Sequence, residues 1–332
     1  MADKGPLKTD ATAGPKAAAP PGGSARAVFH EAWWLDATSP NGWGAVTETR
    51  DGRVRGWLPY ALQRRDGVLW CGLPPLTRLT FPVIDVEGGK YETASRTHFQ
   101  VESELIRGLP PASVHEFVLP PDHGNALAWQ VNGFDARVQH TFRIDPGTSE
   151  AVMWAQLNSK TRNLIRRAQD ALQPVSLDAE TFVAHYRANL GALVSAAEVA
   201  SVGRLAQASL AHGQGRAIGV SDAGGRPHAA ALFVWDGRDY YYFLSTRNAE
   251  NAALGAVDFL VWLGMTDAMA RGRRFDFDGV SSASRLRFLQ SFGGRLSHRI
   301  VVSRRSLGYQ GRLLLRRLRH RLTRRGEREE FP

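Results

Sequence analysis

The sequence contains almost no cysteine and no long apolar stretch. Cys71 is the only cysteine among 332 residues, so neither an intramolecular disulfide nor a cysteine-ligated zinc site can form. Because it lies between Trp70 and Gly72 in an apolar run, we interpret it as a buried structural thiol. No run of 18 apolar residues exists, and the first residues lack the apolar core of a signal peptide. These features predict a protein of the reducing cytoplasm.

The chain also lacks the short motifs of several enzyme classes. It has no phosphate-binding G-x-x-x-x-G-K-[ST] loop, no G-x-S-x-G nucleophile turn and no G-x-G-x-x-G after a predicted strand. Without H-E-x-x-H or a comparable ligand spacing, we expect no metal site. His140 and His298 fall on predicted strands, and we interpret both as histidines of the hydrophobic core.

Positive charge is concentrated near the C-terminal end. The formal net charge is +10, and the segment 304–328 alone holds ten arginines against one acidic residue, Glu327. The rest is nearly neutral, which argues against a body that binds nucleic acid, DNA included. Leucines are interspersed with these arginines, which indicates a basic amphipathic helix. We expect it to bind an anionic membrane surface at the inner face, with RNA or a solvated helix end as alternatives.

Composition and periodicity divide the chain into four parts. Residues 1–27 are rich in Ala, Pro and Gly without periodicity, which is typical of a disordered tail. Residues 28–146 and 147–303 each combine strand and helix patterns, and residues 304–332 form the basic tail. In the first half the predicted helices are 29–37, 97–107 and 125–131, and the predicted strands are 43–49, 54–63, 68–73, 114–119 and 138–144.

The second half begins with three predicted helices, 159–171, 181–193 and 197–212, before strands at 216–220, 228–235 and 240–245. A helix from about Val257 to Gly272 follows, then a short buried strand over 274–278, a further helix, and a last strand that ends at Ser303. Since a helix N-terminus then lies beside the strand 240–245, the loop 248–256 suits an anionic or phosphate-bearing ligand.

The two halves resemble each other. In each, a short helix containing Leu-x-aromatic precedes a turn with adjacent glycine and phenylalanine and then an Arg-x-x-His strand, at 127–140 and again at 286–298. Turn signals separate the strands in both halves: Asp51-Gly52 and Asp66-Gly67 in the first, Gly224-Gly225 and Asp236-Gly237 in the second. The pattern predicts one α/β unit used twice.

Several segments resemble acetyltransferase-like proteins built from paired GNAT-type domains, a group that includes Fem peptidyltransferases and BioF2-like acetyltransferases. These segments are Trp34–Ala37, Gly56–Pro59, Pro74–Thr77, the basic helix Arg162–Ala168, the strand Phe275–Gly279, and Phe288 with Phe292–Gly294. The resemblance implies an α/β fold with a mixed, strongly bent sheet in two tandem GNAT-like domains. It also implies transfer of an acyl or aminoacyl group to an amine.

The donor site is expected in the second half. We predict that backbone donors at Phe243, Leu244 and Ser245 bind a developing oxyanion and that the following loop binds the pyrophosphate of acyl-CoA. The loop residues assigned to the donor are Arg247, Asn248, Asn251, Gly255 and Ala256. The leading Arg or Gln of the usual GNAT loop is absent. We expect a bulky residue at Gly255 to abolish donor binding and to leave the fold intact.

The predicted catalytic residues are Asp278, as a general base, and Tyr242, as an acid for the leaving thiolate. The alternative for Asp278 is a helix cap, and for Tyr242 simple strand packing with one wet ring face. The predicted substrate-binding residues are Asp276, Arg162, Arg166, Arg285 and Phe288. For Asp276 a capping or positioning role is preferred, and for the arginines of the helix 159–171 a solvated face is the default.

The expected function is therefore acyl transfer from acyl-CoA to an amine, on a small molecule or an envelope precursor. A Fem-like transfer from aminoacyl-tRNA to a cell-wall or envelope precursor is one alternative. A non-catalytic module that binds a membrane or a polysaccharide is another.

Overall fold

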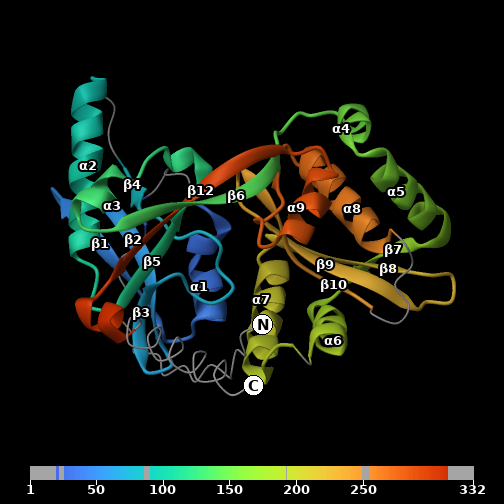
Figure 1. The fold of residues 1–332 in the computed structure, drawn as a ribbon, viewed down its shortest axis with the longest axis horizontal. Helices are drawn as coiled ribbons and strands as arrows, with labels where there is room; N and C mark the ends of the chain where they lie inside the picture. Colours follow the sequence, from blue (N-terminus) through green and yellow to red (C-terminus); the bar gives the residue numbers. More distant parts are fainter. Residues whose placement is uncertain (1–19, 22–25, 86–89, 192, 249–254, 313–332) are drawn as a thin grey trace, which may run out of the picture.

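The computed structural model describes residues 20–21, 26–85, 90–191, 193–248 and 255–312. Most of the predicted disordered tail 1–27 and of the predicted amphipathic tail 304–328 lies outside these residues. The described part is a mixed α/β structure in which helices cover a single large sheet (Figure 1). None of the helices within these ranges is long and apolar enough to span a membrane.

The first half forms two successive hairpins. Strands β1 (Trp43–Arg50), β2 (Arg53–Arg65) and β3 (Val68–Gly72) pair antiparallel. At the first turn Asp51 and Gly52 have φ of 50° and 72°, and the second turn repeats this geometry. Left-handed conformation at both central residues is what a tight type I′ turn requires. The two Asp-Gly turn predictions are therefore confirmed.

The remaining elements of the first half surround these hairpins. They are η1 (Val28–His30), α1 (Ala32–Thr38), β4 (Val83–Ile84), α2 (Tyr91–Arg107), β5 (Val114–Leu119), η2 (Pro121–His123), α3 (Leu127–Val131) and β6 (Asp135–Ile144). Helix α2 begins six residues before the predicted start. The prolines of the run 73–82 predict that it is not a central strand, because they donate no ladder bonds. This run contains only an isolated bridge at Thr80, and the two-residue strand β4 follows it.

The second half contains α4 (Glu150–Gln156), α5 (Ser159–Ala171), β7 (Gln173–Leu177), α6 (Ala179–Leu190), α7 (Ala196–Ala211), β8 (Gly215–Ser221), β9 (Pro227–Trp235), β10 (Asp239–Arg247), α8 (Ala256–Ala270), β11 (Arg274–Asp276), α9 (Ala283–Gln290) and β12 (Arg295–Arg305). Helix α4 and strand β7 were not predicted. The N-cap Ser149 accepts a hydrogen bond from Val152 N–H at the start of α4. Strand β7 contains Pro174, which an edge strand tolerates because its outer side needs no ladder bond.

The two halves arrange their strands in the same way: β1-β2-β3-β5 in the first half corresponds to β8-β9-β10-β11 in the second. The full order is β1-β2-β3-β5-β12-β6-β11-β10-β9-β8, with β7 added beyond β8. In each half two antiparallel pairings lead to one parallel pairing, β3 with β5 and β10 with β11. The prediction of two tandem units related by an internal repeat is confirmed by this order.

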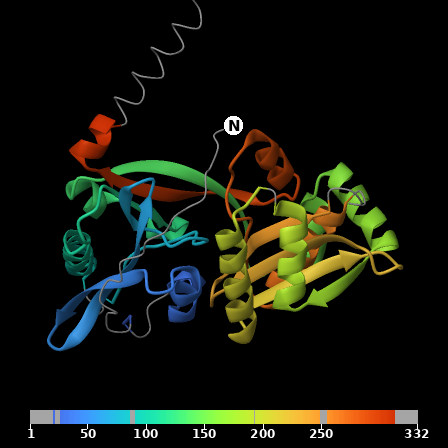
Figure 2. The same cartoon turned by 90° about the horizontal axis from the view of Figure 1, so that it is seen from below.

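The halves exchange their last strands. β12, the end of the second half, pairs with β5, whereas β6, the end of the first half, pairs with β11. β6 and β12 also pair with each other, and together they bridge the two lobes (Figures 1 and 2). His140 and His298 are directly opposite in this pairing, at equivalent places of the repeat, but both are exposed. Their prediction as core histidines is wrong, because they lie where the paired strands face solvent.

Helices cover both faces of the second-half sheet. In Figure 1, α6 and α7 lie below β8–β10, while α5, α8 and α9 lie above. Side chains alternate accordingly, since Tyr241 and Phe243 belong to one core cluster and Tyr240 and Tyr242 to the other. The first cluster also contains Phe29, whose ring centroid lies 4.9 Å from that of Tyr241, so one core continues through both halves.

The exchanged strands predict that neither half folds alone. Residues 1–146 without β12 would leave β5 and β6 without their common neighbour. We expect the full chain to unfold in one cooperative urea transition by circular dichroism, and the 1–146 fragment to show none. A cooperative transition of the isolated fragment would contradict this expectation.

Candidate functional site

The parallel strands β10 and β11 separate after a short contact. They pair only over Asp239–Tyr241 and Arg274–Asp276. Beyond Asp276 the chain turns to β6, where Phe277 N–H donates to Phe142 O at 3.0 Å and Val280 N–H to His140 O at 2.9 Å. From Tyr242 onward, β10 therefore has a strand partner on one side only among the described residues. Ligands of open α/β sheets bind at such a gap, at the carboxyl ends of the strands.

The backbone of β10 is irregular at this gap. Its pairing with β9 shifts register between Tyr242 and Leu244, so Phe243 lies at a β-bulge. The carbonyl of Phe243 accepts a hydrogen bond of 3.2 Å from Arg78 Nη2. The guanidinium of Arg78 also lies 4.7 Å from the centroid of the Phe243 ring. A side chain from the first half thus reaches the bulge of the second.

Helix α8 begins near the end of β10, with Gly255 as its N-cap. Its first backbone N–H groups, those of Ala256 and Val257, precede the first intrahelical bond, from Phe259 N–H to Gly255 O. Free N–H groups there suit an anion. Asp258, in the same turn, has its pKa raised by burial.

Gly255 is required for packing. Its φ is +91°, and a Cβ atom would lie 2.2 Å from the carbonyl oxygen of Leu164 on α5. The expectation that a bulky residue here leaves the fold intact is wrong, because the backbone of α5 occupies that space.

Asp276 ends β11 in a fully buried site. Its Oδ1 accepts hydrogen bonds from Thr141 Oγ1 at 2.7 Å and Arg299 Nη2 at 3.0 Å, and its Oδ2 accepts one from Arg143 Nε at 2.9 Å. Burial alone would raise the pKa of Asp276, but Arg299 and Arg143 hold it at about 2. The geometry supports a positioning role, since no exposed surface of Asp276 is left for a substrate.

Asp278 follows in a left-handed conformation, with φ of 63°. Its Oδ2 contacts Arg78 Nε at 2.5 Å and its Oδ1 contacts Arg299 Nη1 at 3.4 Å. Burial raises the pKa of Asp278, although both arginines act in the opposite direction. The capping alternative is wrong, because the N-cap of α9 is Ser282, whose Oγ accepts from Arg285 N–H.

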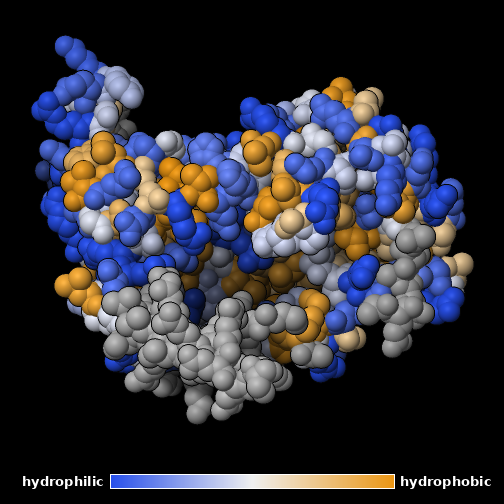
Figure 3. Space-filling view, viewed as in Figure 1, coloured by the Kyte–Doolittle hydropathy of each residue, from blue (hydrophilic) through white to orange (hydrophobic). Residues whose placement is uncertain are grey.

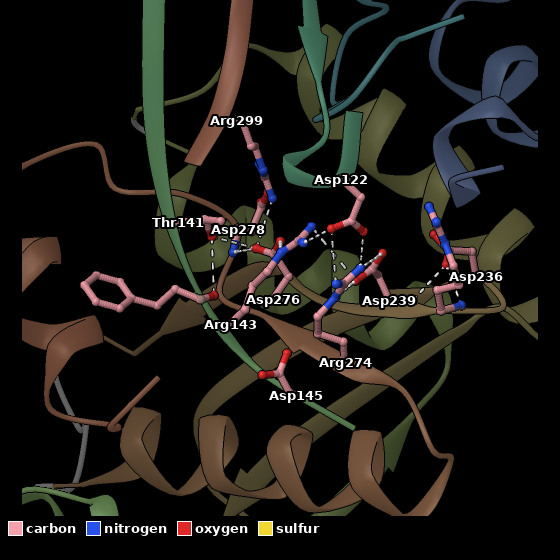
Figure 4. A network of polar contacts seen from close by, with 12 residues as sticks. Asp122, Thr141, Arg143, Asp145, Asp236, Asp239, Arg274, Asp276, Asp278 and Arg299 are labelled. Carbon is pink, nitrogen blue, oxygen red and sulfur yellow. Dashed lines mark hydrogen bonds and ion pairs between the residues drawn. The ribbon is translucent and has the colours of Figure 1, made fainter. Parts of the chain in front are cut away.

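The two carboxylates belong to a larger network (Figure 4). Arg274, at the start of β11, pairs with Asp239 at 2.6 Å and with Asp122 of η2 at 2.6 Å. Arg143 lies between Asp276 and Asp122, whose closest approach to it is 3.6 Å. The network thus joins strands of both halves through charged contacts that are largely buried.

Other predicted residues gather at the gap. Tyr242 is 2% exposed, and its side chain makes a hydrogen bond with that of Ser245. Burial raises the pKa of Tyr242, and neither its ring nor those of Tyr240 and Tyr241 has the predicted wet face. Arg285 donates to Gly279 O at 3.0 Å and to Phe277 O at 3.3 Å, so it braces the loop that holds Asp278.

Some predicted residues lie elsewhere. Arg162 donates to carbonyls at the end of α4, the shortest bond being 2.6 Å to Leu157 O, and Arg166 lies over the Trp154 ring. Both have structural partners in place of the predicted substrate. Among the other predicted residues, Leu244 and Asn248 are half-buried and Arg247 is exposed. The ring of Phe288 packs on that of Phe292. Asn251 lies outside the described residues.

Sequence reasoning missed the arginines that organise the site. Arg78 lies in the run 73–82, whose prolines indicate only that it is not a central strand. Arg143 and Arg299 lie on strands, where they resemble outward-facing charges. Position 299 directly follows the Arg-x-x-His pattern, but a single sequence does not show that this side chain is buried. Within the described ranges no three His, Cys, Asp or Glu side chains are grouped to hold a metal ion.

Comparisons with known proteins agree with this geometry. Residues 159–283 match the family model of the acetyltransferase (GNAT) domain, and this segment contains β10, α8 and β11. The resemblance stated from the sequence is confirmed for the second half. No curated protein matches the chain by sequence.

Solved structures resemble the chain over both halves. FemX has a TM-score of 0.63 at 13% identity, covering 84% of this chain and 92% of that one. The C-terminal domain of a putative lysylphosphatidylglycerol synthetase from Agrobacterium fabrum has 0.52 at 13%, covering 82% and 87%. A tandem GNAT protein from the clavulanic acid biosynthesis pathway has 0.51 at 12%, covering 79% and 82%. The fold is thus mixed α/β and GNAT-like, and the findings together support an acyltransferase.

Asp276 makes a prediction about acid stability. Its folded pKa of about 2 lies below the ordinary value of 3.8, so the stabilisation is present above about pH 4 and is lost as pH falls toward 2. The shift corresponds to roughly 2 kcal/mol. Asp276→Asn leaves Arg143 and Arg299 undercompensated and should cost about 3 kcal/mol at pH 7.

Urea unfolding at pH 7 and at intervals down to pH 2 measures both effects. Asp170→Asn, which changes an exposed carboxylate on α5, is the matched control and should cost little. Equal stability of the two variants at pH 7 would rule out the structural role given to Asp276.

Proposed function

We propose that this chain is an acyltransferase that moves an acyl group from acyl-CoA to the amine of a small molecule or an envelope precursor. The observation that carries the proposal is the separation of β10 from β11 beside the N-terminus of α8. That arrangement offers backbone groups to a thioester and N–H groups to phosphates in one place.

The donor is proposed to lie along the free side of β10. The backbone of Phe243, Leu244 and Ser245 follows the last residue that pairs with β11, so its polar groups on that side face the gap. The N–H groups of Ala256 and Val257, at the N-terminus of α8, are proposed to bind the pyrophosphate. The bulge at Phe243 interrupts the regular pairing of β10 with β9 where the thioester of the donor is proposed to lie.

Acyl transfer to an amine forms a carbon–nitrogen bond and breaks the carbon–sulfur bond of the thioester. The amine must lose a proton, and the thiolate leaves. Asp278 is proposed to accept that proton, since its raised pKa brings it closer to that of a useful base. Each of its oxygens contacts one arginine and retains a second lone pair.

Tyr242 is less well suited to protonate the thiolate. Burial raises its pKa, which makes the phenol a weaker acid. A thiolate is itself a stable leaving group near neutral pH. We therefore propose that Tyr242 orients Ser245 at the gap.

A Fem-like transfer from aminoacyl-tRNA to an envelope precursor is the second candidate. The observation that favours it is the likeness to FemX, with a TM-score of 0.63 over most of both chains. The missing Arg or Gln of the GNAT pyrophosphate loop also fits a donor without CoA. The basic tail is then proposed to contact RNA, whereas the first candidate assigns it to an anionic membrane surface, a difference that co-sedimentation with anionic vesicles tests.

Donor binding separates the two candidates. A ligand that binds the folded state raises Tm by mass action, and a hundredfold excess over Kd contributes about 2.7 kcal/mol. We expect acetyl-CoA or longer acyl-CoAs to raise Tm by several degrees, with free CoA as the control for the nucleotide part. A rise with aminoacyl-tRNA alone would select the second candidate, and no rise with any donor would contradict acyl transfer.

Asp278 and Arg78 predict a change in the pH profile. Asp278→Asn removes the base and should lower kcat at least ~10²-fold. Arg78→Ala removes a cation from Asp278, so the pKa of the carboxyl rises and the acidic limb of kcat/KM moves up by about one pH unit. Arg78→Lys should restore part of the shift, because it restores the charge without the fork of N–H groups.

Arg50→Ala is the control for the arginine variants, since it breaks a surface ion pair with Glu48 far from the gap in sequence. It should leave the profile unchanged. An unchanged acidic limb in Arg78→Ala, with normal stability, would remove Asp278 as the titrating base.

A further inference from the structure

A small pocket lies where the two halves meet around the exchanged strands. Its volume is about 230 Å³, and its lining includes Asp122 of η2, Arg143 of β6, Arg274 of β11, and Arg295 and Ser297 of β12. Three arginines therefore face one aspartate in the lining. The carboxylates that balance them, Asp239 and Asp276, are buried and do not line the pocket.

Arg143 lines this pocket, and its guanidinium retains unused hydrogen-bonding capacity. Its side chain is 3% exposed, and its Nε donates to Asp276 Oδ2. Its Nη2 is buried and makes no hydrogen bond to any residue that the structure describes. The nearest ion-pair contact of that nitrogen is Asp239 Oδ1 at 4.0 Å, beyond hydrogen-bond range. Leaving a buried charged donor unsatisfied is costly unless a ligand completes it.

Arg295 supplies a second cation, which can leave its present partner for a bound anion. Its side chain is 73% exposed and contacts Asp145 at 3.2 and 3.4 Å. Exposed ion pairs of this kind contribute little to stability, so exchanging Asp145 for a bound anion costs little free energy. In Figure 4, Asp145 lies apart from the buried network around Asp276. Arg295 is the residue directly opposite Arg143 in the pairing of β12 with β6.

We propose that this pocket is a subsite for one anionic group, a carboxylate or a phosphate, held by Arg143 and Arg295. Its volume is below that of usual drug-sized sites, so it takes a single small group. Asp276 connects the pocket to the gap, since it contacts Arg143 on one side and accepts from Asp278 N–H on the other. Assigning the group to the amine acceptor rests on the proposed acyl transfer, whereas the binding itself does not.

Binding of inorganic phosphate to the full-length chain tests the subsite without any turnover. Tm is followed against phosphate concentration at constant ionic strength, which gives an apparent Kd. Arg295→Gln removes one charge-assisted contact and should weaken that Kd about tenfold. Arg305→Gln, an exposed arginine on the same strand, has the same change in charge and should leave Kd unchanged.

A second variant adds charge of the opposite sign. Ser297→Asp places a carboxylate in the lining, which repels an anion. Phosphate should then raise Tm no more than chloride does at the same ionic strength. Equal Kd values in Arg295→Gln and Arg305→Gln, or no phosphate-dependent rise in the parent chain, would overturn the proposal. Phosphate binding without any donor-induced rise would keep the subsite and reject acyl transfer.

The same titration distinguishes the source of the anion. Inorganic phosphate, acetate and a monomeric short-chain phosphatidylglycerol are compared in the parent chain and in Arg295→Gln. Tightest binding of acetate assigns a carboxylate, that of inorganic phosphate a soluble phosphate, and that of the lipid a headgroup. Each assignment requires that Arg295→Gln weakens the preferred anion, and a preference that survives this change counts against the subsite.

Discussion

One buried carboxylate, Asp276, holds together the centre of the molecule. It lies on β11 and accepts from Arg143 on β6, Arg299 on β12 and Thr141 on β6. Three strands from two halves thus converge on two oxygen atoms. A buried charge is tolerated only when its hydrogen bonds are nearly complete, so the positions of these strands are mutually dependent. Arg299 extends the constraint to Asp278, and from there Arg78 extends it to the bulge of β10.

This arrangement explains why the first half belongs to the candidate site without a GNAT match of its own. Between β3 and α2 it has the proline-rich segment, where the second half has the loop that leads into α8. Arg78 projects from this segment to Asp278. The segment that corresponds in the repeat to the loop before α8 thus supplies a contact to the other half. We therefore propose that the two halves have different roles, the second binding the donor and the first positioning Asp278.

Local patterns predicted the fold well and the site only in part. Asp-Gly turns, period-two strands and the repeat of helix and Arg-x-x-His strand depend on near neighbours, so they could be recognised in a single sequence. The strand–loop–helix–strand order predicted the N-terminus of α8 beside β10. The burial of Arg143 and Arg299 was not predicted, because it depends on which strands become neighbours after the exchange. His140 and His298 were predicted to lie in a core for the same reason, because nothing in their own segments indicates exposure.

The exchange of β6 and β12 has a consequence during synthesis. β5 and β6 leave the ribosome long before β12, which is the last strand among the described residues. At ribosomal rates the interval is on the order of ten seconds, and throughout it β5 presents an edge with unpaired backbone groups. Pairings this distant in sequence form slowly because loop closure must precede them. The nascent first half should thus be a preferred client of chaperones that bind exposed strand edges until β12 arrives.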